Sequence, residues 1–271
     1  LGLSHNVREL YAFLCQHYVP GDRIFGFGFS RGAFTIRTLV GFIVKFGVLK
    51  RSAFVGEADL RRKIKLLYRA YRKAHSGAGA DPLFAAAVRG VRDAMPWAKL
   101  PAGYLVEGRP SPKHFHDTEI EFMGLWDTVD AYGFPTDEMR EGWDKLVWPL
   151  SMRNRNLSSK VKRALHALSL DDERNTFHPL LWNEEGEDGT AGQPNTAAAP
   201  VRQGSDADNI RKERLSQVWF IGMHADVGGG YPDDFLSYVP LCWVLNHTED
   251  YKLILKKGKL VLFELEKEKE T

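Results

Sequence analysis

The spacing of apolar residues near the start of the chain predicts a helix, a strand and a second helix in succession. Residues 5–18 place one apolar stripe on a helix, made of Val7, Leu10, Tyr11, Leu14 and Tyr18. Pro20-Gly21-Asp22 ends that helix, and the apolar run over 23–29 is typical of a buried parallel strand. Residues 31–46 return to helical spacing. This order indicates an α/β fold with a mostly parallel sheet and flanking helices.

The pattern changes between residues 57 and 117. Residues 60–73 read as a basic amphipathic helix with an apolar stripe of Leu60, Ile64, Leu67 and Tyr71. Its other sides carry Arg61, Arg62, Lys63, Lys65, Arg69, Arg72 and Lys73. A second short helix is expected near 83–94. We interpret 57–117 as a helical, lid-like insertion whose basic face is either solvated or contacts an anionic membrane.

Further strands are predicted toward the carboxyl end of the chain. Residues 120–126 form an apolar run that ends in Asp127, and residues 217–223 form one that ends in His224. The mixed stretch 161–170 is either a helix end or a strand, and Asp171 follows it. Residues 184–209, rich in Gly, Glu, Asp, Ala, Asn and Pro, predict a flexible surface loop.

Length and composition narrow the class of protein. A chain of 271 residues with 44% apolar residues can bury one sizeable core, so a single catalytic domain spanning 1–271 is expected. The net charge of +2 gives no general argument for nucleic acid. No apolar stretch is long enough to span a bilayer and no signal peptide is visible, which predicts a soluble protein. Cys15 and Cys242, both in apolar contexts, are expected to be buried free thiols.

The chain starts at Leu1, without a methionine, and enters a helix almost at once. We interpret it as a fragment whose upstream strands lie outside this sequence.

Gly28-Phe29-Ser30-Arg31-Gly32 lies where the first predicted strand meets the second helix. This Gly-x-Ser-x-Gly layout is that of a nucleophile elbow, a sharp turn that lifts a serine hydroxyl to its tip. Gly28 and Gly32 are expected because the turn leaves no room for a Cβ at either position. A dinucleotide loop is disfavoured, since no strand ending in Asp or Glu follows at the right distance. The P-loop pattern Gly-Lys-Ser/Thr is missing as well.

A serine, an aspartate and a histidine thus follow three predicted strands, in the chain order of a hydrolase triad. Serine needs a histidine to take its proton and a carboxylate to hold the imidazole. Ser30 and His224 supply the first two groups, and Asp127 is the favoured acid. Asp171 is the alternative acid, and Asp130 and Asp226 are weaker ones, Asp226 fitting better as a brace for its loop.

Other histidines carry less chemical weight. His166 in Ala-Leu-His-Ala-Leu reads as a packed core residue rather than a rival base. His114 and His116 lie in a polar loop without a carboxylate or cysteine at metal-binding spacing, so no metal site and no cofactor are predicted.

Five segments together resemble one family: Pro20-Gly21-Asp22; 28–34; Gly124-Leu125-Trp126-Asp127-Thr128-Val129; 166–171; and 222–231. It is the α/β-hydrolase domain shared by type VI secretion phospholipase effectors of the first Tle group and many bacterial and fungal relatives. The resemblance covers Leu3 to about Trp243 and implies Ser30 as nucleophile, His224 as base and Asp127 as acid. The family opens with a strand ending in Asp-Gly-Thr, which this chain lacks. The Arg31 amide can therefore supply one oxyanion donor, while the second stays unassigned.

The resemblance implies a phospholipase or lipase that cleaves acyl esters through an acyl-enzyme. It also implies a lipid or acyl-ester substrate, secretion by a type VI system, and a secretion-apparatus or immunity protein as partner. The 60–73 helix is the expected site of peripheral membrane contact. Two alternatives stay open: an esterase or thioesterase for small soluble acyl groups, and a non-catalytic binding module with the same fold.

Overall fold

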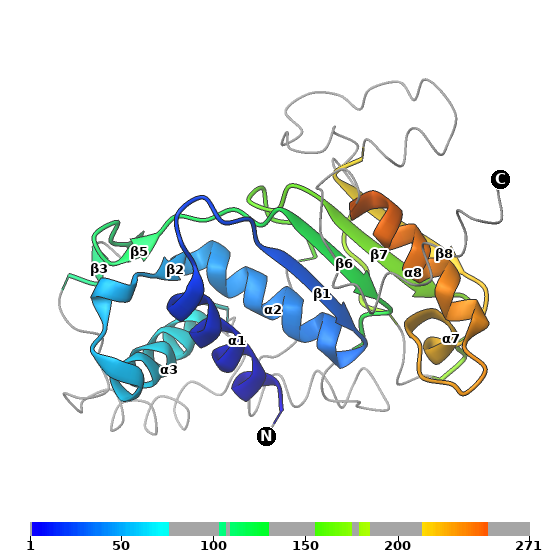
Figure 1. Ribbon diagram of the computed structural model, residues 1–271, viewed down its shortest axis with the longest axis horizontal. Coiled ribbons are helices and arrows are strands. Elements are labelled where there is room, and N and C mark those ends of the chain that lie inside the picture. The colour runs from blue at the N-terminus through cyan, green and yellow to red at the C-terminus, as the bar shows by residue number, and fades with distance from the viewer. Residues whose placement is uncertain are drawn as a thin grey trace, which may run out of the picture.

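A four-stranded parallel sheet forms the centre of the fold. The computed structural model describes residues 2–75, 103–106, 109–129, 155–174, 179–184 and 213–248. The sheet has the order β1-β6-β7-β8 (Figure 1). Its strands are β1 (Phe25–Phe29), β6 (Phe122–Trp126), β7 (Ala164–Ser169) and β8 (Leu215–Phe220). The predicted α/β class and parallel sheet are confirmed, and the ambiguous stretch 161–170 contributes a strand.

Helices cover both faces of this sheet. They include α1 (Leu3–His17), α2 (Arg31–Phe46), the short α7 (His224–Gly228) and α8 (Phe235–Thr248). A Cβ on Gly26 would lie 2.8 Å from Ile36 of α2, whereas one on Gly124 would lie 2.8 Å from both Phe27 and Val244 of α8. Because successive strand residues point to opposite faces, α2 and α8 pack on opposite sides of the sheet.

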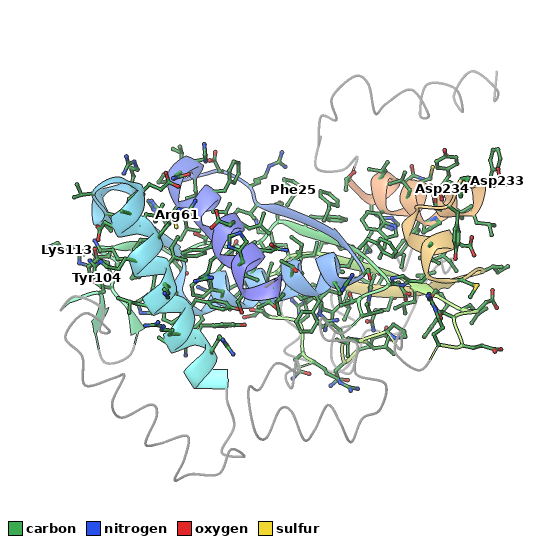
Figure 2. The ribbon with its side chains drawn as sticks, turned by 90° about the horizontal axis from the view of Figure 1, so that it is seen from below. Phe25, Arg61, Tyr104, Lys113, Asp233 and Asp234 are labelled. Carbon is green, nitrogen blue, oxygen red and sulfur yellow. The ribbon has the colours of Figure 1, made fainter. Side chains whose placement is uncertain are left out.

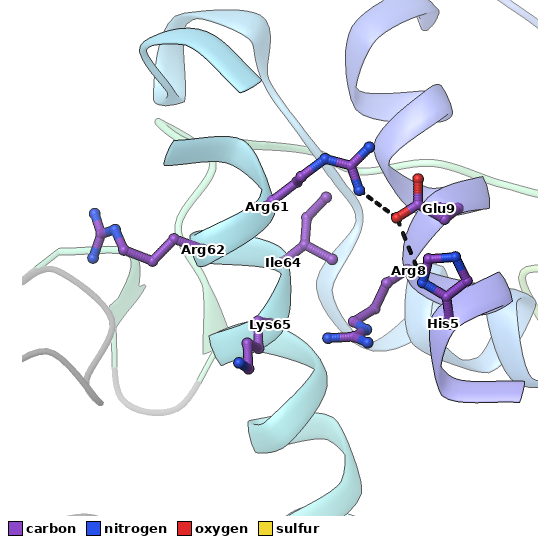
Figure 3. A pocket seen from close by; sticks show the side chains of 7 residues that line it. All are labelled: His5, Arg8, Glu9, Arg61, Arg62, Ile64 and Lys65. Carbon is purple, nitrogen blue, oxygen red and sulfur yellow. Dashed lines mark hydrogen bonds and ion pairs between the residues drawn. The ribbon is translucent and has the colours of Figure 1, made fainter. Parts of the chain in front are cut away.

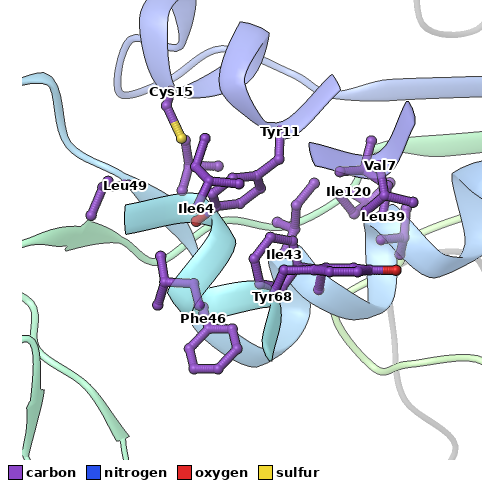
Figure 4. Close-up of a cluster of buried hydrophobic side chains, with 14 of the residues drawn as sticks. Val7, Tyr11, Cys15, Leu39, Ile43, Phe46, Leu49, Ile64, Tyr68 and Ile120 are labelled. Atoms are coloured by element: carbon purple, nitrogen blue, oxygen red, sulfur yellow. The ribbon is translucent and has the colours of Figure 1, made fainter. Parts of the chain in front are cut away.

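The main core joins α1, α2 and α3 (Gly56–His75) (Figure 4). The Phe42 ring of α2 contacts aromatic rings of both other helices. The centroid of the Tyr11 ring on α1 lies 4.4 Å away and that of the Tyr68 ring on α3 lies 5.5 Å away. The hydroxyl of Tyr11 donates to the Gly47 carbonyl at 2.8 Å, so this buried phenol is satisfied. Burial raises the pKa of the neighbouring Cys15 thiol to about 12. Cys15 and Cys242 are both thiols outside any disulfide, although Cys242 is only partly buried.

The apolar stripe of α3 belongs to this core. Leu60, Ile64 and Leu67 are at most 1% exposed, packed against the helices before them. The stripe therefore faces the protein core, and the membrane contact predicted for this helix would involve its basic face. Arg61, Arg62 and Lys65 remain exposed on the cationic side, whereas Lys63 is buried. Much of this charge is paired within the protein: Arg61 with Glu9 and Glu57, and Arg62 and Lys63 with Asp59.

The position of α3 does not confirm a lid. The helix lies at one end of the long axis of the molecule, whereas α7 and α8 lie at the other (Figure 1). Figure 2 shows the same separation between Arg61 and the pair Asp233 and Asp234. The predicted second helix at 83–94 and nearly all of the predicted loop 184–209 lie outside the described residues.

Short elements before and after α3 brace this end of the molecule. They are β2 (Val48–Leu49), η1 (Arg51–Ala53), β3 (Leu105–Val106), β4 (Arg109–Pro110) and β5 (Phe115–His116). β2 pairs with β5 and β3 pairs with β4, both antiparallel. The rings of Tyr104 and His114 stack at 4.2 Å, and Tyr18 contacts His116, which gives these histidines packing partners. Within the described part of the chain, no helix combines the length and apolar character that a bilayer span needs.

Candidate functional site

Ser30 occupies a strained turn between β1 and α2. Its backbone has φ 57° and ψ −128°, in a region that residues other than glycine rarely adopt. Two backbone hydrogen bonds of Ser30 hold the turn. The Ser30 amide donates to the Trp126 carbonyl at 2.9 Å, and the Ser30 carbonyl accepts from the Phe34 amide at 3.2 Å. The serine therefore sits at the tip of a strand–turn–helix, as the sequence predicts.

The two glycines of this turn differ in the space around them. A Cβ on Gly28 would lie 2.8 Å from backbone atoms of Gly32 and Ala33, whereas no described atom lies within 4 Å of one on Gly32. The expectation that both positions exclude a Cβ is thus wrong for Gly32. The close approach at Gly28 comes from the α2 backbone, which passes directly over the end of β1.

We expect Gly28→Ala to lower the free energy of unfolding by about 3 kcal/mol, since a backbone collision has no side chain that can rotate away. Gly32→Ala is the matched control and should change it by less than about 1 kcal/mol, because alanine is the better helix former. Urea unfolding followed by circular dichroism measures both. Equal losses would contradict this account of the turn.

A hydrogen-bonded chain links Ser30 to His224 and Asp127. The Ser30 hydroxyl lies 2.7 Å from Nε2 of His224, and Nδ1 of the same ring lies 2.6 Å from Oδ2 of Asp127. A carboxylate can only accept, so Nδ1 carries the proton and Nε2 accepts from the serine. The structure thus brings together three residues that the sequence separates by up to 194 positions.

Asp127 is fully buried, and hydrogen bonds from the last residue of β7 hold its carboxylate. Its Oδ1 accepts from the Ser169 amide at 3.2 Å and its Oδ2 from the Ser169 hydroxyl at 2.7 Å. These bonds and the His224 contact offset the cost of burying a carboxylate. Asp127 has a positive φ of 40°, which turns its side chain off the end of β6. The sequence analysis did not identify Ser169 as a partner of Asp127. The only indication in the sequence is that this hydroxyl lies near the end of the stretch 161–170, which was a possible strand.

His224 is placed by the loop between β8 and α7. Its ring lies 4.5 Å from the Phe29 ring, so the residue before the serine also packs on the imidazole. Oδ2 of Asp226 accepts from the Met223 amide at 2.8 Å and secures the start of α7. Asp226 therefore braces its own loop, which agrees with the sequence interpretation.

The other predicted residues lie elsewhere. Asp171, the alternative acid, accepts from the Gly222 amide at 2.7 Å and not from His224. His166 is fully buried, with the Thr128 amide donating to its Nε2 at 3.0 Å and Nδ1 facing Gln217 at 3.3 Å. Burial, with Arg37 nearby, lowers the pKa of His166 to about 3, so it stays neutral. Asp130 lies outside the described residues.

Arg31 is the first residue of α2 and its side chain is exposed. The first amides of a helix have no partner within the helix, so the Arg31 N–H is available beside the Ser30 hydroxyl.

A metal would have to compete with existing hydrogen bonds at this site. Ligand atoms of Asp127, Asp172 and His224 all lie within 4.8 Å of one another, a distance that suits a shared cation. However, Nδ1 of His224 and Oδ2 of Asp127 face each other, and both oxygens of Asp172 accept from Arg174. The arrangement fits a hydrogen-bonded protein site better than a metal-ligand set.

Comparison with known proteins identifies the family of this chain. A family model described as "T6SS, Phospholipase effector Tle1-like, catalytic domain" matches residues 1–247. The chain belongs to this family. The resemblance drawn from the sequence motifs is therefore confirmed, and the Tle1-like match includes all three residues of the Ser30–His224–Asp127 chain.

The chain is also similar to a curated fungal protein. An uncharacterised protein of Saccharomyces cerevisiae (strain ATCC 204508 / S288c), YEL023C, is 27% identical over 180 residues, which cover 66% of this chain. The matched part is 21% of the yeast protein, so this Tle1-like chain corresponds to about a fifth of that relative. No solved structure matches the chain significantly.

Proposed function

We propose that this Tle1-like domain is a serine ester hydrolase of the α/β-hydrolase type that acts on phospholipids. Ser30 is the nucleophile, His224 the general base and Asp127 the acid. The single observation that carries the proposal is the chain of hydrogen bonds at 2.7 and 2.6 Å that ends on a strained serine. Membership in a family of phospholipase effector catalytic domains supports the choice of lipid substrate.

The reaction follows from this geometry. His224 Nε2 takes the hydroxyl proton as Ser30 Oγ attacks the ester carbonyl, and Asp127 stabilises the charged imidazole. The carbonyl oxygen becomes an oxyanion, to which the Arg31 amide donates. His224 then passes the proton to the leaving alcohol, so the ester bond breaks and an acyl-serine remains. Water, deprotonated by the same histidine, hydrolyses that acyl-enzyme and frees Ser30.

Exposed apolar side chains beside the His224 loop favour a lipid over a small soluble ester. Helix α7, which begins at His224, is in contact with α8. Phe235 and Val239, one helical turn apart, are 79% and 58% exposed. Met223 and Ile221 on the loop itself are exposed as well. Large apolar side chains this exposed suit contact with acyl chains.

The cationic groove between α1 and α3 is a second surface relevant to membranes. It has a volume of about 390 Å³ and is lined by His5, Arg8, Glu9, Arg61, Arg62, Ile64 and Lys65 (Figure 3). Arg61 turns inward to Glu9, whereas Arg62 and Lys65 extend away from it. Membrane contact through this helix stays a prediction, now limited to its cations. Delivery by a type VI system and binding of an immunity protein likewise remain proposals that rest on the family.

We expect the complete protein to hydrolyse anionic phospholipid vesicles faster than a short-chain soluble ester. Phe235→Ser should lower vesicle turnover about tenfold while changing soluble-ester turnover less than twofold, because only the vesicle reaction needs the apolar patch. Phe13→Ser is the matched control, since Phe13 is an exposed phenylalanine on α1. Release of fatty acid from vesicles and of alcohol from the soluble ester measures the two rates.

The same assay separates the alternatives. Preference for the soluble ester, with no effect of Phe235→Ser, favours an esterase or thioesterase for small acyl groups. No turnover on any acyl ester favours a non-catalytic binding module.

Reversing the charges of Arg62 and Lys65 tests the cationic groove. A loss of vesicle turnover that disappears at high salt assigns it to headgroup contact, and an unchanged rate assigns it to a solvated surface.

A further inference from the structure

A second buried carboxylate lies beside the Asp127–His224 pair. The Asp172 side chain, in the loop after β7, is only 1% exposed. One of its oxygens lies within 4.8 Å of ligand atoms of both Asp127 and His224. The adjacent Asp171 instead binds the Gly222 amide, so the two neighbouring aspartates serve different partners.

Arg174 holds Asp172 in a fixed orientation. Its Nε donates to Oδ1 at 2.9 Å and its Nη2 to Oδ2 at 2.6 Å, while its backbone amide also donates to Oδ1 at 3.1 Å. A two-pronged contact of this kind sets the plane of the carboxylate as well as its distance. The hydrogen bonds from Arg174 lower the pKa of Asp172, and the backbone amide of His224 acts in the same direction. Asp172 is therefore charged, and its carboxylate lies close to His224, the general base.

The surroundings of His224 contain several other charged or titratable groups. Asp127 comes from the end of β6, Arg174 from the loop after β7, and Asp226 from α7 itself. Tyr231, after α7, interacts electrostatically with Arg174, and so does Asp127. The groups around His224 therefore bring two negative charges, on Asp127 and Asp172, and one positive charge, on Arg174.

We propose that Asp172, held by Arg174, is a positioning residue for His224. It secures the first residue of α7 through the His224 backbone amide and sets a second negative charge beside the imidazolium that forms when His224 takes the serine proton. This rests on the proposed function, because the charge matters only if His224 carries a proton during the reaction.

The two members of the ion pair should displace the pH profile in opposite directions. Asp172→Asn removes negative charge, so the imidazolium is less favoured and the acid limb of kcat/KM for a soluble ester should move about one pH unit lower. The kcat should fall about tenfold with little change in KM. Arg174→Gln removes positive charge and should move the acid limb to higher pH. Glu173→Gln is the matched control, an exposed carboxylate in the same loop, and should leave the limb in place.

A purely structural ion pair predicts a different result. The proposal is overturned if the acid limb moves in the same direction in Asp172→Asn and in Arg174→Gln. It is also overturned if the acid limb does not move in Asp172→Asn. If Asp172→Asn does not fold, Arg174→Gln decides by the direction of its displacement. Asp172→Glu, which keeps the charge, should restore the acid limb of the native protein.

NMR titration separates this inference from the proposed function. In the Ser30→Ala protein, which needs no turnover, the midpoint of the His224 ring titration should move to lower pH on adding Asp172→Asn. If the native protein hydrolyses no ester and takes no fluorophosphonate label, the proposed function fails while the titration still reports on Asp172. If turnover is normal and the midpoint does not move, only the inference on Asp172 fails.

Discussion

Replacing Ser30 with alanine should abolish ester hydrolysis, lowering kcat on phospholipid vesicles by about 10⁶-fold. The Ser30 hydroxyl lies 2.7 Å from Nε2 of His224, which can take its proton, so the serine oxygen is placed to form the acyl-enzyme. The fold should survive, because the substitution leaves the backbone hydrogen bonds of the turn in place. Release of fatty acid by the complete protein measures the loss.

Covalent labelling tests the same residue without a choice of substrate. A fluorophosphonate reacts with an activated serine, so it should label the native protein on Ser30 and fail to label Ser30→Ala. Ser52→Ala is the matched control, an exposed serine in η1 that should leave labelling unchanged. Undiminished labelling of Ser30→Ala would falsify the assignment of the nucleophile.

Replacing Asp127 with asparagine should lower kcat by about 10⁴-fold, close to 5.5 kcal/mol of transition-state stabilisation. Asparagine keeps the shape of the side chain but removes its charge and offers an amide N–H to the ring. The imidazole then loses its 2.6 Å acceptor and the tautomer that leaves Nε2 free to take the serine proton. Steady-state kinetics measure the loss, with circular dichroism to verify the fold.

Asp171→Asn provides the control for this assignment. Asp171 has the same chemistry and also follows a strand, but its carboxylate holds the Gly222 amide. We expect the Asp171→Asn substitution to lower kcat less than tenfold, because it weakens the hydrogen bond that orders the β8–α7 loop. The reverse outcome, with Asp127→Asn nearly fully active and Asp171→Asn inactive, would move the acid to position 171.

Local patterns in the sequence determined most of the elements that surround the site. The helix expected over 31–46 is present with those bounds, and the strands before Ser30, Asp127 and His224 lie within a few residues of their predicted positions. Short-range physics suffices here, because helical periodicity and strand-like apolar runs depend on neighbouring residues alone. The same holds for the elbow, whose strain is set by one turn of chain between β1 and α2.

Tertiary structure alone decided which polar groups meet. Both Asp127 and Asp171 follow a strand, and the sequence left the choice of acid open. Only the positive φ of Asp127 and the packing of β6 against β7 direct that carboxylate to His224, 97 residues away. Ser169 and Asp172 gain their importance in the same way, from partners on other strands and loops.

The face of α3 shows the same division between sequence and structure. Its stripe of Leu60, Ile64 and Leu67 specifies an amphipathic helix, but it does not specify the apolar partner, which is equally a membrane or a protein core. Contacts with α1 and α2 settled that choice, because those helices also need to bury an apolar face. The sequence by itself determined that this helix and the Ser30 turn form. Tertiary packing determined what each of them touches, since burial and hydrogen bonding depend on groups that are distant along the chain.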